Sequence, residues 1–403
     1  MPGALQFRPL ASDEHAAFHR CAATAFHEHV DDELLARWAR VEELDRSWVV
    51  VDGEEIVGTA LNYTLSLSVP GGSLDCAGIS WVTVHPTYRR RGILTGLVDR
   101  LLDDARNRRE PLAALWTSNT TVWGRFGFGP AAFGETLRLP IPGARLREPL
   151  RDSEPRPRLV PKDGSAALVD PLYEHVRGER PGLPSRTTDW WESRLLFEGD
   201  RQLVLVEDAD GAARGYAIYQ SHGIPPNVRI EVVELIALDT PACTALWRFL
   251  TGLELATSVE APYRPVDDPL PFLLDDIRGA VVTKLTETLW LRLLDLPRAL
   301  TERRWAARTE LTLSVRDAAI PENDGLWRLQ TLEGEGAACT RADPEAEPDI
   351  ALDVRELSSA YLGGVSLAQM ASAGLVEERT DGALAALDHA LHVPVAPWAP
   401  EHF

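Results

Sequence analysis

The sequence is most informative at Val82-Thr83-Val84-His85-Pro86-Thr87-Tyr88-Arg89-Arg90-Arg91-Gly92-Ile93-Leu94, where an apolar strand leads through a loop of arginines and glycine into a helix. The unpaired N–H groups at the start of a helix, together with the helix dipole, bind anions such as a pyrophosphate. Glycine lets the backbone approach the phosphates, and arginines add charge-assisted hydrogen bonds. The alternative is a solvated basic turn, but cations at a helix N-terminus oppose the dipole. We therefore predict an anion-binding loop.

The segments around this loop alternate between helical and strand patterns. Apolar residues have helical spacing from Ala16 to Phe26, and again from Gly92 to about Arg109. Strand-like runs are found at Ser47–Val51, Glu55–Val69, Gly78–Val84 and Leu112–Trp116, the first two joined by a turn at Asp52-Gly53. Strands interleaved with helices predict an α/β or α+β domain built on a mixed sheet.

The later part of the chain returns to this mixed pattern after a proline-rich interruption. The polar stretch Ile141–Pro161 contains Pro142, Pro149, Pro155, Pro157 and Pro161, which predicts a linker or domain boundary. Beyond it we predict strands at Gln202–Glu207, Ala213–Gln220, Arg229–Ala237, Glu310–Val315 and Gly325–Leu329, and helices at Pro241–Leu253, Val354–Tyr361, Leu367–Ala373 and Ala383–Leu391. Asp210-Gly211 predicts a hairpin turn.

Length and composition exclude several classes of protein. At 403 residues the chain is long enough for two or three domains, and its hydrophobic fraction of 45% is that of a globular protein. Four dispersed cysteines without a C-x-x-C pair argue against a zinc ribbon and a disulfide scaffold, and we expect no metal site. The apolar runs are too short for a membrane span, and the N-terminus lacks the features of a signal peptide. We therefore expect a cytoplasmic protein.

The charge balance bears on the partners. There are 61 acidic and 41 basic residues, which gives a formal net charge of −20. Nucleic-acid binding needs a basic field to neutralise phosphates, so we expect no nucleic-acid partner. An acidic protein attracts cationic ligands, although negative charge also serves solubility alone.

Three segments resemble a known family. The strand, the Arg89-x-x-Gly92 loop and the helix resemble the acyl-coenzyme A site of the GNAT acyltransferase superfamily, with Leu94 at a position that is usually glycine or alanine. The segment Val122-Trp123-Gly124-Arg125-Phe126-Gly127-Phe128-Gly129-Pro130-Ala131 and the ending Glu401-His402-Phe403 resemble the enhanced intracellular survival (Eis) acetyltransferase family. The resemblance spans the whole chain.

This resemblance implies an architecture and an activity. It implies a GNAT domain at 1–145, a second, degenerate GNAT-like domain at 146–290, and a sterol-carrier-like domain at 291–403 that delivers the C-terminus to the active site. Members of the family use acetyl-coenzyme A to acetylate amines of aminoglycosides and other polyamines, and they assemble as hexamers. We therefore expect acetyl-coenzyme A as co-substrate, a small-molecule amine as acceptor, and a homo-oligomer.

The resemblance also assigns the cofactor site. The strand backbone at Val82, Thr83 and Val84 would meet the pantetheine of the coenzyme. The pyrophosphate would lie in a cradle formed by Arg89, Arg90, Gly92, Ile93 and Leu94. Ser118 and Val122 would flank the cofactor on its far side.

The catalytic groups match the family in one position and depart from it in another. The family's base is the C-terminal carboxylate, which here belongs to Phe403. The tyrosine that serves the family as general acid is replaced by Trp123, whose indole N–H donates a hydrogen bond but is too weak an acid to give up its proton. The thiolate is then protonated by water or another group, or the indole only hydrogen-bonds the reacting atoms, or the site no longer performs acetyl transfer.

Five further residues match positions that line the family's acceptor pocket: Glu28, Trp38, Trp81, Trp116 and Glu401. Carboxylates beside tryptophan faces suit an ammonium-bearing substrate through charge pairing and cation–π contacts, whereas ordinary core packing is the other interpretation of the tryptophans. Because Trp116 replaces a histidine of the family, we expect a bulkier and drier cleft with Trp81 and Trp123.

Three functions remain open at this point. The first is an acetyl-coenzyme A-dependent N-acetyltransferase with direct transfer, because no cysteine or serine stands out as a nucleophile. The second is a repurposed enzyme of the same fold that tailors a natural product without acetyl transfer. The third is a non-catalytic protein that binds or sequesters a cationic molecule.

Overall fold

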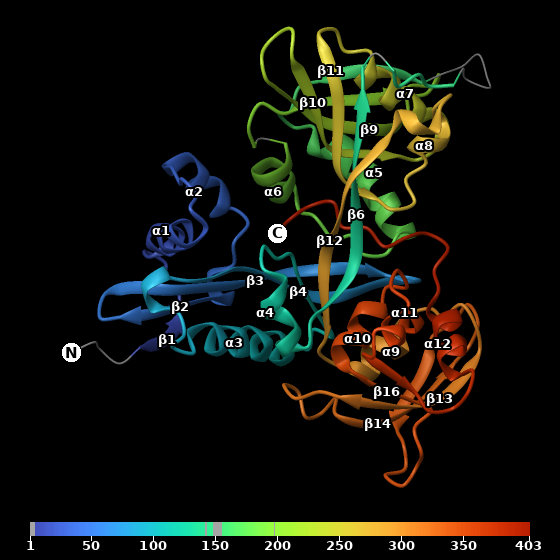
Figure 1. Cartoon of the computed structure of the whole chain (residues 1–403). Helices are drawn as coiled ribbons and strands as arrows, with labels where there is room; N and C mark the ends of the chain where they lie inside the picture. Colours follow the sequence, from blue (N-terminus) through green and yellow to red (C-terminus); the bar gives the residue numbers. More distant parts are fainter. Residues whose placement is uncertain (1–4, 142, 148–154, 197) are drawn as a thin grey trace. The chain divides into compact units, whose positions relative to one another are not determined.

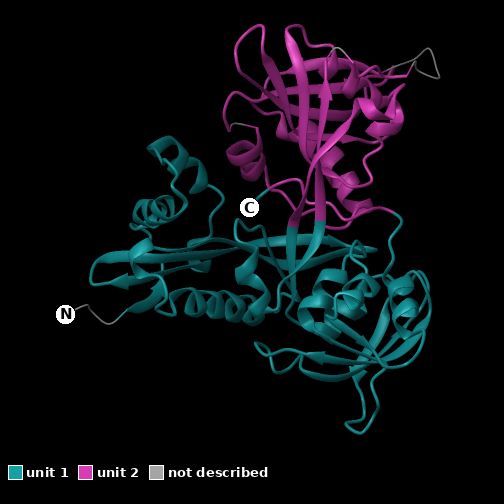
Figure 2. Ribbon diagram, viewed as in Figure 1, with its two compact units in different colours: residues 1–132, 289–394, 402–403 teal, residues 133–288, 395–401 magenta. Residues whose placement is uncertain are grey.

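The computed structural model describes residues 5–141, 143–147, 155–196 and 198–403. The chain forms two compact units (Figure 2). Unit 1 contains residues 1–132, 289–394 and 402–403, and unit 2 contains residues 133–288 and 395–401. Strands β6 (Gly129–Pro140) and β12 (Val281–Leu293) carry the chain from one unit to the other. The described residues contain no helix that is both long and apolar enough to cross a membrane.

The N-terminal part of unit 1 is a mixed sheet with helices on both faces (Figure 1). The strands are β1 (Gln6–Pro9), β2 (Ser47–Asp52), β3 (Glu55–Val69), β4 (Gly72–Val84), β5 (Leu112–Leu115) and the end of β12, in that spatial order. Neighbours pair antiparallel except β4 and β5, which are parallel. Helices α1 (His15–Phe26) and α2 (Asp32–Trp38) lie on one face, and α3 (Ile93–Asn107) lies on the other.

Helix α3 is fixed to this sheet by its apolar face. The buried side chains recur at helical spacing and are Ile93, Leu97, Val98, Leu101, Leu102 and Ala105. Gly58 on β3 permits a close approach, because a Cβ there would lie 2.8 Å from the Cγ2 atom of Ile93. The N-terminus of α3, which follows the arginine loop, is therefore held rigidly against the sheet.

The C-terminal part of unit 1 is a second, smaller sheet with helices. Its strands are β13 (Thr309–Arg316), β14 (Gly325–Thr331), β15 (Ala337–Arg341), β16 (Ile350–Asp353) and β17 (Val376–Glu378), in the order β15-β14-β13-β16-β17. The helices are α9 (Leu296–Glu302), α10 (Val354–Ala360), α11 (Leu367–Ser372) and α12 (Ala383–Leu391). A buried ion pair of 2.6 Å between Arg292 of β12 and Asp317 joins this part to the first sheet.

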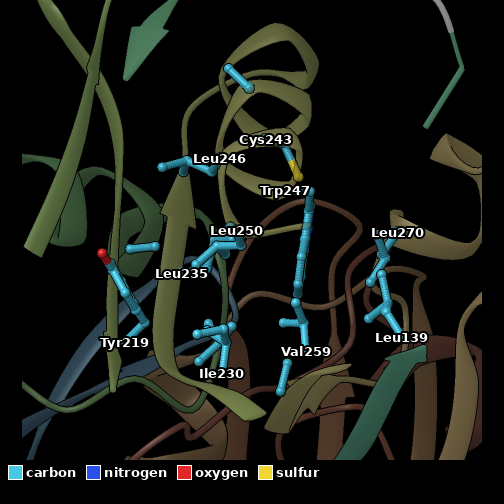
Figure 3. Close-up of a cluster of buried hydrophobic side chains, with 14 of the residues drawn as sticks. Leu139, Tyr219, Ile230, Leu235, Cys243, Leu246, Trp247, Leu250, Val259 and Leu270 are labelled. Carbon is cyan, nitrogen blue, oxygen red and sulfur yellow. The ribbon is translucent and has the colours of Figure 1, made fainter. Parts of the chain in front are cut away.

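Unit 2 is built on a sheet in the order β6-β11-β10-β9-β8-β7, with β12 beside β6. The bounds are β7 (Arg156–Val160), β8 (Gln202–Glu207), β9 (Ala213–His222), β10 (Val228–Ala237) and β11 (Ala256–Pro265). The helices are α5 (Ala166–Glu179), α6 (Thr188–Trp190), α7 (Thr240–Thr251) and α8 (Leu270–Leu273). Trp247 of α7 lies in the core beside Val259 of β11, with Leu246 and Leu250 directed toward β9 and β10 (Figure 3).

Most predicted elements are confirmed, and the predicted linker is partly wrong. The predictions for β3, β8 and α12 agree with the structure at both ends, and a turn at Asp208–Ala212 joins β8 to β9 as the Asp210-Gly211 pair predicted. The stretch Ile141–Pro161 nevertheless contains strand β7. Pro157 is tolerated there because β7 is an edge strand, where an N–H can be missing. Pro142 and Pro149 lie outside the described residues.

The fold class is α+β, as predicted from the mixed pattern. The predicted domain boundaries at 145 and 290 stay predictions.

Candidate active site

Strands β4 and β5 separate to form a fork in the sheet of unit 1. Their parallel pairing ends at Ile79 and Leu115, whereas β4 continues to Val84 and pairs on its other side with β3. A β-bulge lies at the same level of the sheet, where the β3–β4 register shifts between Thr59 and Leu61. Trp81 in this bulge has a φ of 52°, which a residue with a side chain rarely adopts. Among the described strands, residues 80–84 of β4 therefore have a free edge toward β5.

The side chains at the end of β4 leave its free edge accessible to a ligand. The Thr83 side chain is buried, and its hydroxyl lies 2.6 Å from the Thr59 hydroxyl. The Val82 and Val84 side chains are only half-buried. The backbone of these residues is thus paired with β3 on one side, while its edge toward β5 is open to a ligand.

The arginine loop has the features of an anion site. Gly92 caps α3 with a φ of 79°, and no side chain fills the cap position. A Cβ at Gly92 would meet nothing within 4 Å, so there is space in front of the helix N-terminus. Arg90 also has a positive φ, of 65°. Arg89 and Arg90 are exposed, and neither has an ion pair within the described part of the chain.

The third arginine of the loop has a structural role. The Arg91 guanidinium lies 4.7 Å from the centre of the Tyr88 ring, and the Tyr88 hydroxyl donates to Asp52 over 3.0 Å. The hydrogen bond to Asp52 raises the pKa of Tyr88. Arg91, Tyr88 and Asp52 therefore hold the loop to the sheet, which leaves Arg89 and Arg90 available. Ile93 is buried and Leu94 half-buried, as expected for the first turn of a packed helix.

Trp123, which occupies the position of the family's general acid, is the last residue of α4 (Thr120–Trp123). Its indole N–H donates to the Thr117 hydroxyl over 2.8 Å, and its ring contacts those of Phe126 and Phe128. The single N–H of the indole is thus already used. Ser118 is exposed and Val122 half-buried on the same segment.

Thr117 is a residue that the sequence interpretation missed. Its oxygen accepts from the Trp123 indole and from the Asn119 backbone N–H over 2.9 Å. Because both lone pairs accept, the Thr117 O–H hydrogen is directed away from them and remains a potential donor. A threonine six residues before a tryptophan does not by itself predict a hydrogen bond between them. The bond from the Trp123 indole to Thr117 is visible only in the fold.

The C-terminal residues lie at the fork of β4 and β5. Phe403 is buried, and its Cδ2 atom lies 3.3 Å from the position that a Cβ would occupy on Gly78 of β4. The His402 ring stacks on Trp116, the first residue after β5, with ring centres 3.8 Å apart and planes inclined by 24°. A residue of β4 just before the fork and the residue that follows β5 thus contact the end of the chain.

Gly78→Ala is expected to displace Phe403. A Cβ at position 78 would lie 2.5 Å from the Cδ1 atom of Leu65 and 3.3 Å from Phe403, so side chains must move. We expect a loss of about 1–3 kcal/mol in the free energy of unfolding, measured by urea titration, together with reduced turnover. Gly72→Ala on the same strand is the control, because a Cβ there meets nothing within 4 Å. Equal stability and activity of both variants would contradict the contact.

The acceptor-pocket residues fall into separate groups. Trp38 and Trp81 pack together with ring centres 4.7 Å apart, and both contact His19 of α1. Trp116 lies instead beside His402, and Glu28 is exposed just after α1. Trp123 packs in the core behind Thr117.

Glu401 is engaged within unit 2. Its carboxylate accepts from Arg186 over 3.0 Å, and Arg186 also pairs with Glu234 over 2.6 Å. Arg186, which the sequence interpretation missed, is completely buried and lies over the Tyr173 ring at 3.7 Å. The predicted carboxylate is therefore an anchor for the C-terminal segment in this structure.

Comparisons with known proteins agree with this geometry. Residues 6–131 and 182–293 each match a family described as an acetyltransferase (GNAT) domain, and residues 296–400 match the sterol carrier protein domain. The N-acetyltransferase Eis of Mycobacterium tuberculosis is 33% identical over 390 residues, which cover 93% of this chain and 94% of that protein. The chain belongs to the Eis family of N-acetyltransferases.

Two further relatives are similar over nearly the whole chain. An uncharacterized N-acetyltransferase of Streptomyces avermitilis is 36% identical, over 91% of each chain. The crystal structure of Eis1 from Mycobacterium abscessus superimposes with a TM-score of 0.85 at 30% identity, over 99% of this chain and 100% of that one. The chain is thus an acetyltransferase with two GNAT domains and a sterol-carrier-like domain, and acetyl-coenzyme A is the co-substrate of such enzymes.

Proposed function

We propose that this enzyme transfers the acetyl group of acetyl-coenzyme A to an amine of a cationic small molecule, of the aminoglycoside or polyamine class, in the cytoplasm. The observation that carries the proposal is the position of Phe403, which is buried at the fork where β4 leaves β5. A terminal residue is usually exposed and poorly ordered, so its burial at this point needs an explanation. Use of the α-carboxylate as the base supplies one.

The cofactor site fits acetyl-coenzyme A. The free edge of β4 at Val82, Thr83 and Val84 offers backbone groups to the pantetheine amides. The exposed Arg89 and Arg90 and the uncapped start of α3 at Gly92, Ile93 and Leu94 suit a pyrophosphate. We assign Ser118 and Val122, on the segment after β5, to the far side of the cofactor.

Acetyl transfer to an amine needs groups that accept and donate protons, and this chain supplies candidates for both roles. When bound, acetyl-coenzyme A supplies an activated acyl group as a thioester. The Phe403 carboxylate accepts, directly or through water, the proton that the substrate ammonium loses before the free amine attacks the thioester, although its reference pKa of ~3.5 makes it a weak base. The Trp123 N–H is held by Thr117, so we assign donation toward the reacting atoms to the Thr117 hydroxyl and protonation of the leaving thiolate to water.

We assign the acceptor site to the acidic and aromatic residues that the family resemblance selects. Trp38 and Trp81 pack against each other, and Glu28 is an exposed carboxylate just after α1. Trp116 lies beside the C-terminal residues, and Glu401 precedes them. Tryptophan faces and carboxylates bind ammonium groups, and the net charge of −20 favours the approach of a cation. We further propose that the enzyme works as a homo-oligomer, a hexamer as its family resemblance implies.

One observation favours a second candidate function. The single N–H of Trp123 is committed to Thr117, so nothing at the usual acid position can protonate a thiolate. A site of this fold that binds a cationic molecule without acetyl transfer would tolerate such a residue. The two functions differ in one measurement, because only the acetyltransferase releases coenzyme A thiol when an amine is added.

Trp123→Tyr is expected to raise the kcat of acetyl transfer by at least about tenfold, because a phenol of reference pKa near ~10 can protonate a thiolate. The measurement is thiol release from acetyl-coenzyme A with a panel of polyamines and aminoglycosides. Trp123→Phe is the matched control, since it removes the indole N–H without adding an acid. If the wild-type protein binds the coenzyme, and neither it nor the tyrosine variant releases thiol with any amine, the binding function replaces the proposed one.

A further inference from the structure

A cluster of two histidines and one glutamate lies outside the residues used above. His15 and His19 are one turn apart on α1, and Glu42 lies in the segment after α2. The Nε2 atoms of the two histidines are 2.7 and 2.8 Å from the same oxygen, Oε2 of Glu42. The side chains of His19 and Glu42 are 0% and 2% exposed, whereas that of His15 is 17% exposed.

This cluster contains polar atoms whose hydrogen bonding is incomplete. The Oε1 atom of Glu42 and the Nδ1 atom of His19 are both buried without a hydrogen-bond partner among the described residues. The cluster thus holds a buried carboxylate for which no arginine or lysine lies in salt-bridge range within the described part of the chain. Such a group is costly unless a cation neutralises it.

We propose that His15, His19 and Glu42 bind a divalent zinc ion. Two imidazole nitrogens and one carboxylate are a common set of protein ligands for Zn²⁺, with a water in the fourth position. The potential ligand atoms lie within 4.8 Å of one another. Zn–N bonds of 2.0–2.1 Å in a tetrahedron place ligand atoms about 3.3 Å apart, so each histidine Nε2 atom must move about half an ångström farther from Oε2 of Glu42. The partly exposed His15 provides the route of entry and the side for the water ligand.

The aromatic ring beside His19 can accept a hydrogen bond from the imidazole proton that zinc binding would place on Nδ1. When Nε2 binds the ion, the ring proton of His19 moves to Nδ1. The His19 and Trp81 rings meet edge to face, with centres 4.7 Å apart, an arrangement in which an N–H can point at an aromatic face. The ion would join α1 to the segment after α2 directly behind Trp38 and Trp81. Its role would be to hold that aromatic pair in place, and it takes no part in the reaction.

The test is zinc binding by the full-length protein after treatment with a chelator. Equilibrium dialysis against Zn²⁺ is expected to show a single tight site per chain, and Co²⁺ is expected to give the intense visible absorption of a tetrahedral nitrogen–oxygen site. His15→Gln and Glu42→Gln are each expected to weaken zinc binding by more than about tenfold.

The matched control is His175→Ala. His175 forms an exposed pair with Glu179 at helical spacing, so this variant removes a histidine–glutamate pair without touching the cluster. It is expected to bind zinc as the wild-type protein does. His15 is partly exposed, so its glutamine variant is expected to fold, which circular dichroism would verify. A wild-type protein that binds no zinc, or one whose zinc affinity equals that of folded His15→Gln, would overturn the proposal, and the cluster would then be a hydrogen-bonded one only.

Discussion

Deletion of Phe403 is expected to abolish acetyl transfer while leaving the binding of acetyl-coenzyme A intact. The deletion removes the ring that packs at Gly78 and moves the terminal carboxylate to His402. The anion loop at Arg89–Gly92 lies on other elements, so its affinity for the coenzyme is expected to persist. Turnover is measured by thiol release, and coenzyme binding by calorimetry.

Addition of one glycine after Phe403 separates the role of the carboxylate from that of the ring. The Phe403 side chain is retained, but the carboxylate moves by about 3.8 Å along the chain. Because misplacement of a reacting group by even about 1 Å can cost a hundredfold, we expect at least that loss in kcat. The control is Phe403→Leu, which retains the carboxylate at its position. Wild-type turnover from the extended or the shortened chain would exclude the terminal carboxylate as the base.

Arg186→Met is expected to cause the largest loss of stability. Arg186 is buried between Glu234 and Glu401, and the Tyr216 hydroxyl donates to Glu234 over 2.6 Å. Removal of the guanidinium leaves two buried carboxylates without their cation, which costs about 3–5 kcal/mol in comparable buried pairs. The measurement is the free energy of unfolding from urea titration. Turnover is also expected to fall, because Glu401 is two residues before Phe403.

Arg158→Ala is the control for that variant. The Arg158–Glu207 pair has a similar length of 2.6 Å, but its arginine side chain is 50% exposed. Such exposed pairs contribute about 0–1 kcal/mol, so the control is expected to unfold almost as the wild-type protein does. If Arg186→Met were as stable as Arg158→Ala, the buried network would not anchor the C-terminal segment.

The local structure of this chain could be predicted where one physical signal dominated. The apolar spacing after Gly92 predicted α3, since a helix brings Leu97, Leu101 and Leu102 to one face, whereas a strand would direct Leu101 and Leu102 to opposite faces. The proline count misled at Ile141–Pro161, because a strand at a sheet edge tolerates proline. The type of a residue does not reveal whether a strand is central or at the edge.

The site could be predicted only in part. The arginine loop follows from local sequence, and the tryptophans and Phe403 were selected by resemblance to a family. The contacts that hold the C-terminal segment join residues far apart in sequence: Arg186 to Glu401, and Trp398 to Pro181 and Tyr263. His15 and His19 show helical spacing, but Glu42 lies in a different segment, so the cluster is visible only in the fold.

The most direct test of the proposed function is the mass of an amine after incubation with the enzyme and acetyl-coenzyme A. A polyamine or aminoglycoside is expected to gain one or more acetyl groups with the wild-type protein, and none with the chain extended by one glycine. An unchanged mass for every amine, from a protein shown to bind the coenzyme, would contradict amine acetylation. Equal acetylation by both proteins would contradict the terminal carboxylate as the base.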